Sequence, residues 1–203
     1  MRGVLCLVLF ASLACTAFAA DDPEHAVRDA QHAIDTKNAN LFEQRVDAER
    51  ILNAATDMLM AEADKPNGNL PPMLTLMLSS VKDGQARAML QTLIMREAHA
   101  FLRYAILSGH FAGKPDHSVR PGGMLAPLFG DVSMGRKELR VTGPAAPDER
   151  ESVLVPAELK DYGNNNIYPL LLRLRRQPDW RIAEIVNLPD VWNQVLAEAD
   201  AQR

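Results

Sequence analysis

Few side chains in this sequence combine the residue type and the spacing that metal binding requires. His25 and His32 stand on one predicted helix, about 10 Å apart along its axis. One metal ion cannot be held by both without further ligands. Glu97 and His99 are two positions apart and point to different faces of their helix. The sequence therefore predicts no metal site and no cofactor.

The motifs of nucleophilic catalysis and of phosphate binding are also lacking. No Gly-x-Ser-x-Gly turn follows a predicted strand, and Ser108 and His110 have no evident third residue to orient the histidine. The pair Gly122-Gly123 has neither the spacing nor the following lysine of a phosphate-binding loop. These observations favour a protein that is not an enzyme.

Glu184 is the one carboxylate whose position suggests catalysis. The strand register derived below turns it toward the helix-covered face of the sheet, where an unpaired carboxylate is costly. A hydrolase or isomerase that uses Glu184 is therefore the alternative function. Pairing with Arg96 or Arg103, or contact with water at the end of the sheet, is the favoured interpretation.

Methionines are frequent in the helical half of the chain. Their flexible thioethers can line an adaptable apolar pocket, although ordinary core filling explains the same spacing and copper(I) binding is a remote third reading. If a pocket for an apolar ligand exists, we expect its lining to include Met58, Met77, Leu93 and Trp180.

Arg173, Arg175 and Arg181 alternate on the predicted sheet, on the face opposite the core. Such a patch is suited to an anion, either a lipid headgroup or an acidic partner. The competing interpretation is an ordinary solvated face with ion pairs to Glu158.

Length and charge limit the function classes. The 203 residues suit one domain with a substantial core, and a formal net charge of −4 gives no general attraction to nucleic acid. No segment after the N-terminal one is long and apolar enough to span a membrane.

Helical periodicity dominates the first half of the chain. Asp22-Pro23 opens the first helix, Asp47 caps a restart within the second helical region, and a long helix over 85–107 is expected to be central to the core. Glycine and proline interrupt the pattern over 113–136, which predicts a loop with one helical turn over 124–129.

Strand patterns follow over 138–142, 152–162, 167–176 and 180–187. The turn residues predict that Leu159 lies opposite Leu170, and that Leu174 and Leu172 lie opposite Ile182 and Glu184. The result is an antiparallel meander with one face buried under helices. Pro189 opens a last helix.

The predicted organisation is thus an α+β domain over 21–203. Its regions are mainly helical over 21–112, a loop over 113–136, an antiparallel meander over 137–188 and a helix over 189–200. Helices of the N-terminal half pack on a curved sheet of about four strands.

Residues 1–20 have the pattern of a secretory signal peptide. Arg2 precedes an apolar run, and Ala17-Phe18-Ala19 matches a cleavage site near Ala20. Both cysteines, Cys6 and Cys15, precede this site, so the mature chain would hold no disulfide or thiol. The prediction is a periplasmic or secreted protein. Lipidation at Cys15 is the less favoured alternative, because Ser12 replaces the branched apolar residue usual there.

Residues Tyr168 to Leu174, the turn Gln177-Pro178-Asp179 and the strand from Trp180 to Ile185 resemble the end of the sheet in the cystatin-like and nuclear transport factor two-like superfamily. Exported members include phospholipid-shuttling toluene-tolerance proteins. The resemblance implies helices packed into the concave face of a curved sheet. The helix after the last strand departs from the shuttle pattern.

Together these features favour an exported binding domain for an apolar small molecule or lipid, or for an envelope protein. A structural interaction module that uses the loop over 109–135 or the arginine face is a further alternative. The sequence does not indicate an oligomeric state.

Overall fold

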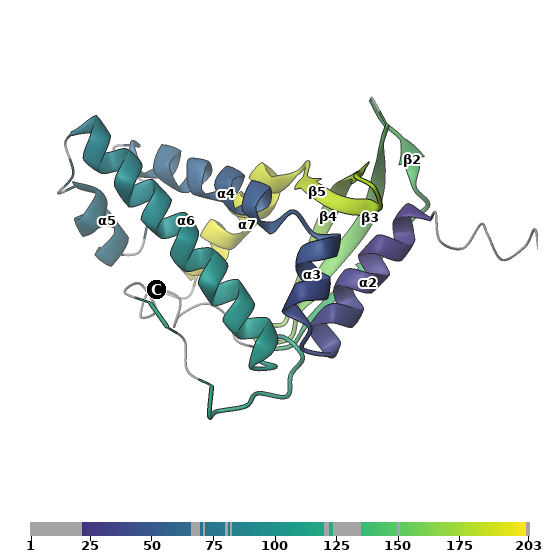
Figure 1. The fold of residues 1–203 in the computed structure, drawn as a ribbon. Helices are drawn as coiled ribbons and strands as arrows, with labels where there is room; N and C mark the ends of the chain where they lie inside the picture. Colours follow the sequence, from purple (N-terminus) through teal and green to yellow (C-terminus); the bar gives the residue numbers. More distant parts are fainter. Residues whose placement is uncertain are drawn as a thin grey trace, which may run out of the picture.

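The computed structural model describes residues 22–65, 70, 72–79, 81, 83–119, 122–123, 135–149 and 151–201, with only the backbone at 72–74 and 199–201. Helices dominate the N-terminal half and strands the C-terminal half (Figure 1). The helices are α2 (Pro23–Asp35), α3 (Ala39–Arg45), α4 (Ala48–Ala63), α5 (Pro72–Ser79), α6 (Gly84–Leu107) and α7 (Leu188–Ala201). The strands are β1 (Lys137–Val141), β2 (Ala146–Pro147), β3 (Ser152–Asp161), β4 (Asn166–Arg176) and β5 (Trp180–Ile185).

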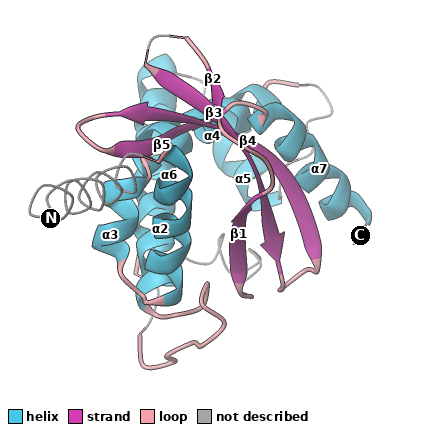
Figure 2. Cartoon of the chain, turned by 90° about the vertical axis from the view of Figure 1, so that its right-hand side faces the viewer, coloured by secondary structure: helices cyan, strands magenta, loops and turns pink. Residues whose placement is uncertain are grey.

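The strands form one antiparallel sheet in the order β1-β3-β4-β5, and the short β2 also pairs with β3. β3 and β4 are the long central strands, with β1 toward one end and β5 toward the other (Figure 2). The α+β class and the order of helices, strands and final helix are as predicted. The two-residue β2 was not predicted.

One face of the sheet carries the main core. Alternate residues of β3 and β4 point to this face, and Val155, Leu172 and Leu174 are at most 2 % exposed. Val153, Ala157, Leu159, Leu170, Trp180 and Ile182 belong to the same cluster, as the predicted alternation requires. At the end of β5, Ile185 packs against the core cluster.

Helix α2 lies against this face through a row of small residues. Ala26, Ala30 and Ala33 are at most 3 % exposed, and their spacing places them on one side of the helix. Small side chains let the helix backbone approach the sheet closely. The carboxylate of Asp22 accepts the Glu24 amide at 3.0 Å, which confirms the predicted helix start.

Helix α5 and the parts of α4 and α6 near it extend away from the sheet (Figure 1). We refer to α5, the C-terminal half of α4 and the N-terminal half of α6 as the helical arm. The arm has its own apolar cluster, separate from the main core, made of Met60, Leu70, Leu78, Leu90 and Ile94 with their half-buried neighbours. Helix α6 is therefore part of two packing units.

Helix α7 occupies the edge of β4 beyond the end of β5. The Asn187 side chain accepts the Leu171 amide at 2.8 Å and donates to the Pro169 carbonyl at 2.9 Å. Gln194 donates to the Ile167 carbonyl at 3.3 Å. These side chains satisfy backbone groups that an open strand edge would offer to another chain.

The hairpin between β3 and β4 differs from the predicted register by two residues. Leu159 lies opposite Tyr168, and Leu170 lies opposite Ala157. The Asp161 carboxylate accepts the Gly163 amide at 2.8 Å, which begins the turn earlier than predicted. The turn ends at Asn165, whose φ is 59°. A shift of two residues keeps every side chain on its predicted face.

Two predictions lie outside the described residues: the signal peptide over 1–20 and the helical turn over 124–129. Among the helices that the structure does describe, none has the length and apolarity needed to cross a bilayer.

Candidate functional site

An apolar cavity of about 310 Å³ lies between the helices and the sheet. Side chains of α2, α3, α4 and α6 form one wall, and those of β1, β3, β4 and β5 form the other. Fourteen of the lining residues are apolar, and Lys137 is the fifteenth. The apolar ones are Ile34, Phe42, Val46, Ala48, Ile51, Leu52, Leu102, Phe111, Leu139, Leu159, Leu170, Leu172, Ile182 and Ile185.

Among the described residues, no polar atom contributes to the cavity surface, although Lys137 is part of the wall. The Lys137 ammonium turns to Asp161, with Nζ 2.6 Å from Oδ1, and lies 5.3 Å from the centroid of the Phe111 ring. Burial lowers the pKa of Lys137 below its usual value of 10.5, while the hydrogen bond that Lys137 donates to Asp161 opposes this shift. Only the hydrocarbon stem of the lysine is left to face the cavity.

A polar cluster joins α3 to α6 next to the cavity lining. Glu43 accepts from Arg103 and lies 3.3 Å from His99 Nε2. These residues neighbour lining side chains on both helices, since Glu43 follows Phe42 and Arg103 follows Leu102. The cluster therefore links α6 to α3 beside the cavity lining.

A second hollow, of about 420 Å³, lies between α4, β5 and the start of α7. Ile51 and Ile185 line both spaces, so the two are adjacent. Unlike the first, the second hollow has charged side chains in its lining, namely Arg50, Asp57 and Glu184.

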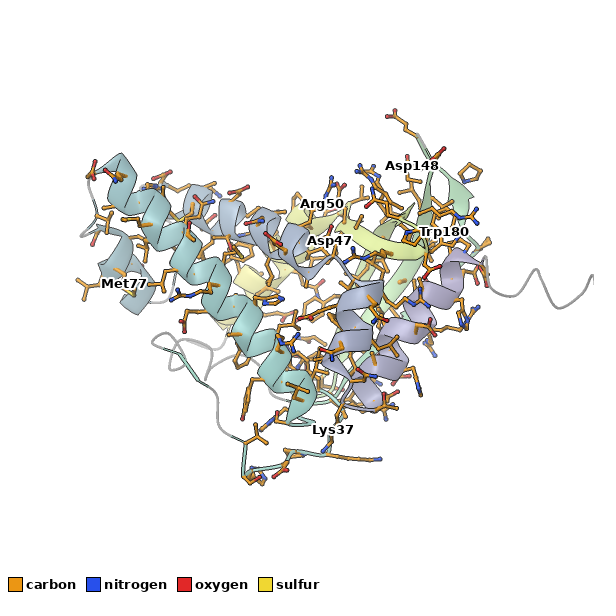
Figure 3. All side chains as sticks on the ribbon, in the orientation of Figure 1. Lys37, Asp47, Arg50, Met77, Asp148 and Trp180 are labelled. Carbon is orange, nitrogen blue, oxygen red and sulfur yellow. The ribbon has the colours of Figure 1, made fainter. Side chains whose placement is uncertain are left out.

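None of the four residues predicted to contact a ligand lines the apolar cavity. Met58 lines the second hollow. Met77 and Leu93 pack in the arm cluster, and Trp180 packs against the main core. Figure 3 shows Met77 at the far end of the arm and Trp180 on the opposite side of the molecule. The structure thus does not bring these four side chains together.

The predicted position of Glu184 on the helix-covered face was wrong. A β-bulge lies between Arg173 and Leu174, so Glu184 pairs with Arg173 and Ile185 takes the place opposite Leu172. The Glu184 carboxylate accepts Arg173 Nη1 at 2.7 Å and lies 3.7 Å from Arg50 Nη2. Glu184 is therefore ion-paired, as favoured from the sequence, but its partners are Arg173 and Arg50 and not the predicted Arg96 or Arg103.

The three arginines predicted to form an anion-binding patch have different surroundings. Arg173 donates hydrogen bonds to Asp148 at 2.6 Å and to Glu184 at 2.7 Å. Because two carboxylates already occupy its guanidinium, fewer of its N–H groups are left for an anion. Arg181 donates to the carbonyls of Glu43 and Val46, at the end of α3. Arg175 lies opposite Arg181 in the sheet. Glu158, the expected partner, binds Arg140 instead.

The contact between Asp148 and Arg173 shifts the pKa of both groups. The hydrogen bond from Arg173 is the largest cause that lowers the pKa of Asp148 below its usual value. The same bond raises the pKa of Arg173. Each group therefore stabilises the charged form of the other, which is typical of a structural ion pair.

Ser108 and His110 lie together at the end of α6, with Oγ 2.7 Å from Nδ1. This contact resembles the nucleophile and base of a hydrolase, but Ser108 is 0 % exposed, so no substrate can reach its hydroxyl. The pair instead stabilises the C-terminal turn of the helix. Among the described residues, no three histidine, cysteine or carboxylate side chains come together as a metal-binding group.

His110 is expected to make the stability of the protein depend on pH. Burial lowers the pKa of His110 below 6.5, and repulsion by His117 acts in the same direction. The unfolded chain then takes up a proton at higher pH than the folded chain, so stability is complete above pH 6.5 and decreases as the pH falls through that value. Urea unfolding at pH 7.5 and 5.5 measures this loss.

His110→Gln should show a smaller loss of stability between the two pH values than the wild type. His32→Gln, at an exposed position on α2, is the control and should keep the wild-type loss. Equal losses in all three proteins would show that His110 does not cause the pH dependence.

The comparisons with known proteins give no relative: no family model, no curated protein and no solved structure matches this chain.

Proposed function

We propose that this protein binds an apolar small molecule, or the hydrocarbon part of a lipid, in the cavity between the helices and the sheet. The observation that supports this proposal is the cavity itself, which has a volume of about 310 Å³ and an apolar lining. This volume is at the lower end of the roughly 300–1,000 Å³ range of ligand pockets.

The energetics of packing support this proposal. Side chains that face empty space lose dispersion contacts on that side, and well-packed cores hold few such voids. An apolar ligand would supply the missing contacts, and it would have no hydrogen bonds to give up on leaving water. A dry apolar cavity can bind a small hydrophobic molecule for this reason.

The same chemistry argues for binding rather than catalysis. General acid, general base and nucleophilic catalysis each need a polar group within reach of the substrate. No polar atom of the described part of the chain faces the cavity, and Glu184, the carboxylate proposed from the sequence, is bound to Arg173.

Export and a cystatin-like origin are part of the proposal. The leader pattern over 1–20 supports a periplasmic or secreted location, where an apolar compound needs a carrier to pass through water. Helices packed on one face of an antiparallel sheet, with an apolar space between them, fit the resemblance to the cystatin-like superfamily.

Leu102→Trp is expected to weaken ligand binding at least tenfold. Leu102 is the residue through which α6 lines the cavity, and an indole at this position would occupy space that a ligand needs. The fluorescence of the uncharged probe N-phenyl-1-naphthylamine, titrated with protein, measures the affinity.

Leu107→Trp is the matched control, because Leu107 is on the same helix but 48 % exposed and outside the lining. It should keep the wild-type affinity. Absence of saturable binding to the wild type, or equal affinity in both variants, would contradict the proposed site. Native mass spectrometry of protein purified from its own compartment would identify a natural ligand.

A further inference from the structure

The second hollow adds a region with charged side chains to the candidate site. It meets the apolar cavity at Ile51 and Ile185, and Met58 adds an adaptable side chain to its wall. Among the described lining residues, the charged groups other than Lys137, whose ammonium turns to Asp161, belong to this outer part. A molecule that occupied both spaces would have a hydrocarbon region inside and a polar group at the outer end.

Arg50 is the cation of the outer hollow. It projects from the N-terminal turn of α4 near β5 (Figure 3), and its side chain is 46 % exposed. Its acidic contact is Glu184, at 3.7 Å, which is longer than a hydrogen bond. The carboxylate of Glu184 has a much closer partner in Arg173, at 2.7 Å. An incoming anion can therefore bind Arg50 and leave Glu184 paired.

Asp57 is the remaining charged group in the lining, and it opposes an anion. It lies seven positions after Arg50 on α4, which corresponds to about 10 Å along the helix axis. That distance is about one Debye length at 0.1 M salt, so repulsion from Asp57 is weak at Arg50. Asp57 also accepts a hydrogen bond from Gln91 at 2.6 Å.

We propose that the ligand is a single-chain amphiphile, with its hydrocarbon chain in the apolar cavity and an anionic head group, carboxylate or phosphate, bound to Arg50 in the outer hollow. This inference rests on the proposed function and adds the chemical class of the ligand. A charge-assisted hydrogen bond to guanidinium would set the orientation of the chain.

Displacement of bound N-phenyl-1-naphthylamine by twelve-carbon compounds tests the head group, with each compound below its micellar concentration. Dodecanoate and dodecyl phosphate should displace the probe at concentrations at least tenfold lower than dodecanol at low salt. Dodecyltrimethylammonium should be the weakest competitor. A difference between the first two compounds would separate carboxylate from phosphate recognition.

Arg50→Gln should remove the advantage of the anions and leave dodecanol affinity unchanged, and Arg50→Lys should restore part of the advantage. Arg28→Gln, at an exposed arginine on α2, is the control and should keep the wild-type preference. Equal affinity for all head groups, a preference for the cation, or an anion preference that survives in Arg50→Gln would overturn the inference while the cavity proposal stands. Failure of every compound and of the probe itself to bind would overturn the proposed function.

Discussion

Replacement of Lys137 by methionine is expected to lower the free energy of unfolding by about 3–5 kcal/mol. Lys137 and Asp161 are both buried, at 8 % and 5 % exposure, and their side chains are 2.6 Å apart. Methionine preserves the apolar stem but removes the charge, so the Asp161 carboxylate loses its counterion inside the protein. Urea unfolding at pH 7 measures the change.

The double variant Lys137→Met with Asp161→Asn is the informative control. It removes both charges, so it should recover most of the lost stability, because a buried ion pair gains little over neutral groups of similar shape. Its affinity for the naphthylamine probe should equal that of the wild type, since only the stem of residue 137 is at the cavity. If the double variant were less stable than the single one, the desolvation argument would be wrong.

Leu174→Ala is expected to cost about 2–5 kcal/mol of stability. Leu174 is 0 % exposed, lies between Val153 and Ile182 in the sheet, and does not line the cavity. Its side chain therefore has neighbours on all sides, and truncation leaves a new void that the surrounding strands cannot close.

The comparison is with Leu159→Ala, on the same face of the sheet but in the cavity wall. Because Leu159 already lacks contacts on one side, its truncation should cost less, and the enlarged cavity should still bind the probe. If Leu159→Ala lost as much free energy of unfolding as Leu174→Ala, side chains would have to fill the cavity in solution.

Local sequence signals predicted the elements well, because caps, turns and periodicity act over a few residues. Asp22 and Asp47 cap helices as expected, and Trp180 begins the last strand. The error at Glu184 has a different origin. A bulge inserts one residue into a strand, and nothing in the alternating pattern before Ala183 marks the insertion.

The site was harder to predict than the fold. Methionine content pointed to Met77, but that side chain fills the arm cluster, whereas Phe42 and Phe111 line the cavity. The cavity depends on how side chains from four helices and four strands meet, and the methionine content of a helix does not determine that arrangement. The spacing of Phe42 and Val46 on one helical face was the available signal, and it is equally typical of a core.

Helix α6 gives the cavity a mechanical property. The helix has 24 residues and is about 36 Å long, with Leu90 and Ile94 fixed in the arm and Leu102 in the cavity wall. Because hydrogen bonds run along its whole length, it transmits a tilt from one end to the other as a stiff rod. A displacement of the arm is therefore expected to shift Leu102 in the cavity wall, because one continuous helix belongs to both packing units.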